Sequence, residues 1–208
     1  MAYAIRTPRL LLRCWSPEDA PRRRALIDSS DAHLRPYIPW MRDEPLSLSE
    51  TAQRLREYRA DFDLDQTWRY AVLHEDTLVG DVGLFPRVGI GALEVGYLLG
   101  VGHTGQGFAT EAVSAMLRIA FEVAGVDRVE IRCDPGNEAS VRMAKRLGFK
   151  HEACLPRRYR DEHENFVDLD LWSLFASNYP TTVASTSAVY ATDCMGMPLL
   201  GSTDNLTA

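Results

Sequence analysis

Cysteine is scarce in this chain and is not arranged to share a ligand. Cys14, Cys133, Cys154 and Cys194 are spread over 208 residues, with no Cys-x-x-Cys pair. This spacing argues against both a zinc site and a disulfide framework. We therefore expect no bound metal and a reducing, cytoplasmic environment.

Long apolar runs are also missing. No stretch approaches the roughly 18 apolar residues that cross a bilayer, and the N-terminus lacks the apolar centre of a signal peptide. Basic residues do not exceed acidic ones, since the formal net charge is −6, which argues against nucleic acid as a ligand. We expect neither a membrane nor a nucleic acid as partner, and a monomer or a homodimer.

Glycine, in contrast, occurs where chemistry is expected. Residues 103–111 read His-Thr-Gly-Gln-Gly-Phe-Ala-Thr-Glu and connect a short apolar segment, 93–100, to a stretch with helical apolar spacing. The amides of Gly105 and Gly107 can approach an anion closely, and the free N–H groups at the helix start add about half a positive charge. This pattern predicts a phosphate-binding loop between a strand and a helix. A tight turn without a ligand would use the same glycines.

A second segment of interest follows one strand later. Residues 128–133 alternate apolar with polar side chains and predict a strand. Residues 134–149 then predict a turn, a short helix and a glycine stop. Asn137 would begin this helix and Ser140 would lie in its first turn. Both residues have two open interpretations, as a cap and a first-turn hydroxyl or as ligand contacts.

The remaining sequence predicts one mixed domain of residues 1–179. Further strands are expected at 9–15, 68–73, 78–85 and 166–174, and helices after Ser16 and Ser47. Residues 180–208 are rich in Thr, Ser, Ala and Gly and lack a period, which predicts a flexible tail. In the alternative, the apolar pairs at 189–190 or 199–200 dock on the domain or on a second subunit.

Together these motifs resemble the GNAT N-acetyltransferases, and in particular their RimJ/RimL-like branch. That branch carries a Gly-x-Gly-x-Ala-Thr-Glu-Ala loop, which corresponds to residues 105–112 here. One strand later it carries Asn-x-x-Ser and then Leu-Gly-Phe, which correspond to Asn137, Ser140 and 147–149. The resemblance covers roughly residues 5 to 178. It implies an α/β (mixed α+β) fold with a central, mostly antiparallel twisted sheet flanked by helices.

The resemblance also implies a reaction and roles for individual residues. An acyltransferase of this family moves the acetyl group of acetyl-CoA to a primary amine, either a protein N-terminal α-amine or a small-molecule amine. Backbone groups of one strand would hold the acetyl group and the pantetheine arm, and Ser140 would protonate the leaving thiolate. The residues implied to bind the cofactor are Tyr97, Leu98, Leu99, Gly105, Gln106, Gly107, Phe108, Ala109, Thr110 and Asn137.

The general base and the acceptor pocket are less well defined. Glu94 is preferred as the catalytic base over Glu130, yet either could pair with arginines, and an α-amine with a pKa near 8 can react without a base. Trp40 and Tyr159 are implied to border the acceptor, although Trp40 could equally be a core anchor. Nearby acidic residues favour a cationic acceptor: Asp43, Glu44, Asp161, Glu162 and Glu164.

Two other functional classes use part of this pattern. A dinucleotide-dependent oxidoreductase also has Gly-x-Gly before a helix, and Asp134 could bind a ribose, but Thr110 replaces its third glycine. A non-catalytic acyl-CoA sensor would keep the loop and lose the proton-handling groups. Asn137 and Ser140 are present, which favours the enzyme.

Overall fold

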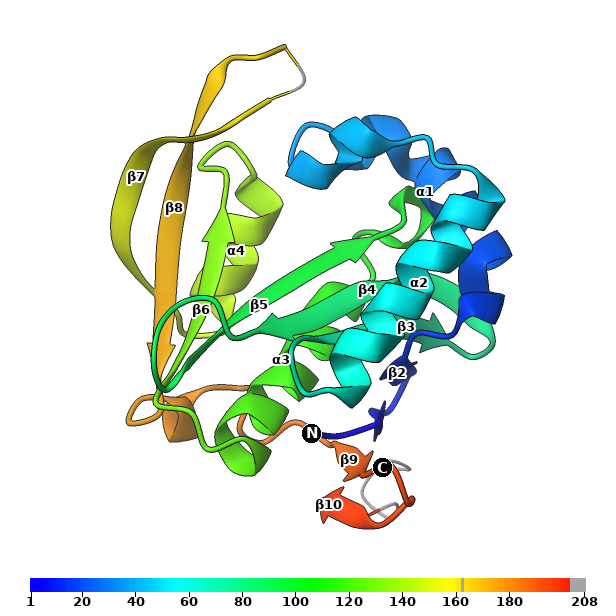
Figure 1. Ribbon diagram of the computed structural model, residues 1–208. Helices are drawn as coiled ribbons and strands as arrows, with labels where there is room; N and C mark the ends of the chain where they lie inside the picture. Colours follow the sequence, from blue (N-terminus) through cyan, green and yellow to red (C-terminus); the bar gives the residue numbers. More distant parts are fainter. Residues whose placement is uncertain (162, 203–208) are drawn as a thin grey trace.

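The computed structural model describes residues 1–161 and 163–202, and within them a ten-stranded twisted sheet carries helices on both faces (Figure 1). The strands are β1 (Ala4–Arg6), β2 (Leu10–Cys14), β3 (Trp68–His74), β4 (Thr77–Phe85), β5 (Ala92–Leu99), β6 (Arg128–Cys133), β7 (Lys150–Arg160), β8 (Phe166–Phe175), β9 (Tyr190–Thr192) and β10 (Pro198–Leu200). The α-helices are α1 (Ala20–Leu34), α2 (Leu48–Asp63), α3 (Phe108–Arg118) and α4 (Glu138–Arg146).

The strand order is β10-β9-β1-β2-β3-β4-β5-β6-β8-β7. Neighbouring strands are antiparallel except for β5 and β6, which run parallel because α3 connects them across the sheet. This is the mixed, mostly antiparallel sheet with flanking helices that the sequence predicted, so the fold class is confirmed. None of the helices among the described residues is long and apolar enough to cross a bilayer.

The two faces of the sheet have separate cores. Val95 belongs to a large cluster that includes α3 and α4, whereas Leu98 belongs to a smaller one that includes α1 and α2. Because side chains alternate along a strand, Tyr97 points toward α3 and α4 and Glu94 toward the opposite face. Strand β5 thus presents Tyr97 to the side of α3 and α4, and Glu94 to the side of α1 and α2.

The helix starts agree with the cap residues in the sequence. Ser47 and Glu50 form a reciprocal capping box at α2, with Glu50 N–H donating to Ser47 Oγ at 3.2 Å. Asn137 Oδ1 accepts the N–H of Ser140 at 3.1 Å at the start of α4. Helix α3 begins after Gly107, which has φ +83° and no side chain to cap the helix.

The C-terminal segment differs from the predicted tail. Strand β9 pairs with β1, β10 pairs with β9, and Val189 and Ala191 are buried. Strands β9 and β10 therefore extend the sheet beyond β1, as in the docking alternative. The sequence signal was weak because these strands are three residues long and their partner is at the other end of the chain. Residues 203–208 lie outside the described residues.

Candidate functional site

The glycine loop has the backbone geometry that an anion site requires. Gly105 and Gly107 adopt φ values of +74° and +83°, in the left-handed region that disfavours side chains. The loop ends at the N-terminus of α3, where N–H groups have no acceptor within the helix. No neighbouring atom lies within 4 Å of the position that a Cβ would take on Gly105. The loop is therefore open to a ligand on this side.

Arg9 is a cation beside this loop that the sequence analysis missed. Its Nη1 donates to the carbonyl of Gln106 at 3.0 Å, and its Nε donates to Glu111 Oε2 at 2.7 Å. Thr7 Oγ1 also donates to Glu111, at 2.6 Å. These contacts tie the loop and the first turn of α3 to the turn before β2. They also place a guanidinium 3.3 Å from the position of a Cβ on Gly107.

Strands β5 and β6 separate just below the loop. Their parallel pairing covers only Ala92, Leu93 and Glu94 on β5, so within the described residues the next five positions have no partner on the β6 side. Figure 1 shows the two strands diverging toward the end of the sheet at which α4 begins. This edge exposes backbone N–H and C=O groups that an extended, amide-containing ligand can pair with as an added strand.

Ser140 lies at this gap and is held by Tyr97. The Tyr97 hydroxyl and Ser140 Oγ are hydrogen-bonded across the space between β5 and α4. Burial raises the pKa of Tyr97 well above its usual value, although the hydrogen bond to Ser140 opposes the shift, so the phenol keeps its proton. Tyr97 can therefore donate to Ser140 Oγ, which leaves the Ser140 hydrogen free to point elsewhere.

Cys133 is the second group that contacts Ser140. Burial and the charge of Asp170 raise the pKa of the Cys133 thiol to about 11, and a hydrogen bond from Ser140 partly offsets this shift. The thiol is therefore neutral and unreactive at physiological pH. The Ser140 hydroxyl thus already contacts one sulfur atom, Sγ of Cys133, in the free protein.

The two candidate bases are both engaged by arginines. Glu94 is 6% exposed and accepts from Arg87 at 2.5 and 2.9 Å. Glu130 is 3% exposed and accepts from Arg128 at 2.9 Å and from Arg132 at 2.9 and 3.1 Å. This is the arginine-partner alternative. Both carboxylates are thus arginine partners in the free protein, and the role of Glu94 as the base stays a prediction.

Asp81 is a third carboxylate on the side of the sheet that carries Glu94, and the sequence analysis did not identify it. It lies on β4 opposite Leu98 of β5 and accepts from Trp15 Nε1 at 3.0 Å. Burial raises the pKa of the Asp81 carboxyl, against the charges of Arg69 and Arg23. A lone Asp in an apolar strand carries no local sequence signal.

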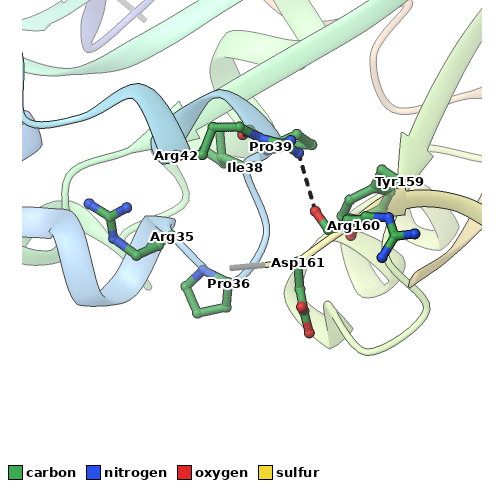
Figure 2. Close-up of a pocket in the computed structure, with 8 residues that line it drawn as sticks. All are labelled: Arg35, Pro36, Ile38, Pro39, Arg42, Tyr159, Arg160 and Asp161. Carbon is green, nitrogen blue, oxygen red and sulfur yellow. Dashed lines mark hydrogen bonds between the residues drawn. The ribbon is translucent and has the colours of Figure 1, made fainter. Parts of the chain in front are cut away.

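Trp40 and Tyr159 come from different elements of the structure. Trp40 is half-buried against the smaller core cluster, with the Arg23 guanidinium 5.3 Å from its ring centroid. Tyr159 lines a pocket between the segment that joins α1 to α2 and the end of β7 (Figure 2), and its hydroxyl donates to Asp134 Oδ2 at 3.2 Å. Tyr159 lies on a strand, since β7 extends to Arg160. Trp40 thus fits its alternative interpretation as a core anchor.

A wider groove of about 490 Å³ runs beside the glycine loop. It is lined by α1, by the turn between β3 and β4, and by the segment from Gly100 to His103, with Arg22 and Ser29 among its polar side chains. The groove provides room for a ligand that continues beyond the loop. Within the described ranges, no group of three or more His, Cys, Asp or Glu side chains could hold a metal ion.

A family comparison accounts for this arrangement. Residues 9–150 match the model of the acetyltransferase (GNAT) domain. The chain belongs to the GNAT acetyltransferase family. It is therefore an acyltransferase, as the loop and the Asn-x-x-Ser segment predicted.

Individual relatives agree with this assignment. The uncharacterized N-acetyltransferase YnaD of Bacillus subtilis is 27% identical over 178 residues, which cover 81% of this GNAT chain and 99% of YnaD. The uncharacterized N-acetyltransferase p20 of Bacillus licheniformis is 34% identical over 89 residues, or 43% of this chain and about half (49%) of p20.

Solved structures share the fold. RimJ of Mycobacterium smegmatis, in complex with CoA-disulfide, superposes with a TM-score of 0.78 at 21% identity, over 88% of this chain and 91% of that one. RimL, a ribosomal alpha-N-protein acetyltransferase in complex with coenzyme A, gives a TM-score of 0.75 at 20% identity, over 80% and 94% of the two chains.

Proposed function

We propose that this protein transfers the acetyl group of acetyl-CoA to a primary amine, by direct attack of the amine on the thioester. The observation that carries the proposal is the unpaired edge of β5, which leads into the glycine loop and has Ser140 beside it. These features match the three parts of an acyl-CoA thioester: an extended amide arm, a diphosphate and a sulfur.

The residues present fit acetyl-CoA. Positive φ at Gly105 and Gly107 leaves their amides open to the diphosphate, with the start of α3 adding its dipole. The free N–H and C=O groups of residues 95–99 suit the amides of the pantetheine arm, and an N–H of Leu98 or a neighbour can stabilise the oxyanion. Asn137 caps α4 with its Oδ1, so its amide nitrogen is the group left to bind that arm.

Ser140 is the proposed proton donor to the leaving thiolate. Tyr97 can donate to Ser140 Oγ, and the Ser140 hydrogen, which is directed at Cys133 in the free protein, would turn to the sulfur of the thioester. A thiol pKa of about 8.5 makes the thiolate a tolerable leaving group, so the donor contributes roughly one to three orders of magnitude in rate.

The acceptor amine supplies its own reactivity in this proposal. Glu94 and Glu130 are each held by arginines, and a protein α-amine with a pKa near 8 is partly unprotonated at neutral pH. RimL acts on a protein α-amine, and the structures overlap well. We therefore assign a protein N-terminal α-amine as the acceptor class.

Thiol release from acetyl-CoA tests the proposal. The wild type is assayed against N-terminal peptides, free amino acids and polyamines, with product masses as proof of acetylation. Ser140→Ala should lower kcat by about ten- to a thousandfold with an unchanged Kd for acetyl-CoA, because a proton donor acts mainly in the transition state. Ser177→Ala, at an exposed serine outside the site, is the matched control. Tight acetyl-CoA binding without turnover on any amine would identify a sensor instead.

A further inference from the structure

Two of the acidic residues expected to attract a cationic acceptor, Glu44 and Asp161, already have partners within the protein. Glu44 is buried and surrounded by Arg23, Arg24 and Arg54, with side-chain N–O distances of 3.8 Å to Arg23 and 3.5 Å to Arg54. The Asp161 carboxylate accepts backbone N–H groups of the β7–β8 hairpin at 2.8 and 2.9 Å. Glu162 lies outside the described residues. The buried Glu44 therefore cannot attract a cationic acceptor, whereas Asp43 and Glu164 remain largely exposed.

Three arginines near Tyr159 have the opposite property, and we call Arg42, Arg157 and Arg160 the arginine rim. Arg42 donates only to backbone carbonyls, at 2.9 Å to Pro39 and 3.3 Å to Arg160. Arg157 and Arg160 stack on the Phe166 ring at 3.9 and 4.2 Å. Among the described residues, no carboxylate forms an ion pair with Arg42 or Arg157. Arg160 has only the exposed Glu164, at 3.6 Å.

The arginine rim spans two elements that face each other. Arg42 comes from the turn at Pro39–Asp43, and Arg157 and Arg160 come from the end of β7. Figure 2 shows Arg42 linked to the backbone of Arg160 across the pocket. Because both sides supply a guanidinium with unused donors, a carboxylate entering between them would meet charge from both.

Sheet register gives the separation between the rim and the reaction centre. Asp170 of β8 lies opposite Cys133, beside Ser140, and Val167 of β8 lies opposite Tyr159. Three residues of strand separate these levels, which corresponds to ~10 Å. An extended peptide covers this distance in about three residues.

We propose that the arginine rim binds the carboxylates of an acidic peptide, so that the acceptor is a polypeptide N-terminus with Asp or Glu at about its second to fourth residues. The inference rests on the proposed function and defines its substrate class. Guanidinium groups suit carboxylates because they can bind both oxygens at once. Exposed pairs are individually weak and screened by salt, so the preference is the joint effect of several contacts.

A charge-switch experiment tests the inference. Peptides beginning with Ser and followed by three Glu, three Gln or three Lys are compared by kcat/KM at low and high salt. The wild type should prefer Glu over Lys by roughly 10- to 100-fold, with the preference falling as salt rises. Arg42→Glu/Arg160→Glu should reverse the order. Arg56→Glu, at an exposed arginine of α2, is the matched control and should keep the wild-type order.

The outcomes separate the inference from the function on which it rests. Equal or better turnover of the Lys peptide refutes the proposal that the arginine rim binds acidic peptides. A higher kcat/KM for glutamate or phosphoethanolamine than for the Glu peptide refutes it as well. No turnover with any acceptor overturns the proposed function instead. In that case, binding of fluorescent Glu and Lys peptides to the protein with CoA decides on the rim. Arg42→Gln, a milder change, gives the same comparison if the double variant unfolds.

Discussion

Tyr97→Phe is the most direct test of how Ser140 is held. The change removes one hydroxyl and keeps the ring that packs between β5 and α4. In the wild type, the Tyr97 phenol is hydrogen-bonded to Ser140 Oγ and retains its proton because burial raises its pKa. Without that donor, the Ser140 hydroxyl can rotate away from the sulfur. We therefore expect a lower kcat and an unchanged Kd for acetyl-CoA.

The size of the effect follows from the single bond that is lost. A neutral hydrogen bond contributes about 0.5–1.5 kcal/mol. If this energy acts only on the transition state, kcat falls by about 2- to 13-fold, since each 1.36 kcal/mol corresponds to a factor of ten. The loss should be smaller than that of Ser140→Ala, because Tyr97 acts through Ser140.

A double-mutant cycle on kcat is the assay. Tyr97→Phe is measured in the wild type and in the Ser140→Ala background, with Tyr70→Phe as control. Tyr70 is also a buried tyrosine with one hydrogen bond, to the carbonyl of Ala2 at 2.8 Å, but it lies on β3, two strands away. Tyr70→Phe should lower stability without changing kcat. An equal effect of Tyr97→Phe with and without Ser140 would refute the positioning role, because the two changes would then be independent.

Three further outcomes are expected. Gly107→Val should abolish acetyl-CoA binding, measured by calorimetry. Gly125→Val, at another glycine with positive φ (+66°), imposes similar backbone strain and should keep binding. Retained binding in a folded Gly107→Val protein would contradict the loop assignment. Ending the chain after Tyr179 should lower the free energy of unfolding by ~1–3 kcal/mol, or roughly 2–12 °C in Tm, because Val189 and Ala191 lose their buried sites, while turnover persists; an unchanged Tm would show that β9 adds no stability. Burial favours a raised pKa for Asp19, but hydrogen bonds from Arg13 and Ser16 outweigh it and lower that pKa, so Asp19→Asn should cost about 1–3 kcal/mol at pH 7. Chemical denaturation should show the difference shrinking below about pH 4, because the carboxylate is protonated first in the unfolded chain and only at lower pH in the folded protein; a constant difference would contradict this.

The parts of the site that could be predicted from sequence are local ones. The glycine loop joins a strand directly to a helix, and Asn137 and Ser140 share one helical turn, so spacing singles out both segments, whereas the roles of their residues come from the family resemblance. Their neighbours depend on distant contacts. Arg9 reaches Glu111 over 102 residues, and the Tyr97 hydroxyl reaches Ser140 over 43. Backbone patterns do not specify where such side chains point.

Two predictions about the site depend on ion pairs that the local sequence does not show. Counting acidic residues near Trp40 and Tyr159 predicted a cationic acceptor, but arginines from α1 and α2 surround Glu44. Glu94 was preferred as a base from its strand, yet Arg87, seven residues earlier, folds back onto it. A sequence shows which charged residues a protein has, whereas the ion pairs in the structure decide which of those charges are available to a ligand.

The separation of β5 and β6 has a consequence for the dynamics of the free protein. Amides on the unpaired side of β5 have no protecting partner there, so they should exchange with deuterium faster than those of the paired β3–β4 hairpin. A ligand that lies along β5 would complete the ladder and slow that exchange. Binding would then protect this part of β5 and stabilise the folded protein against unfolding.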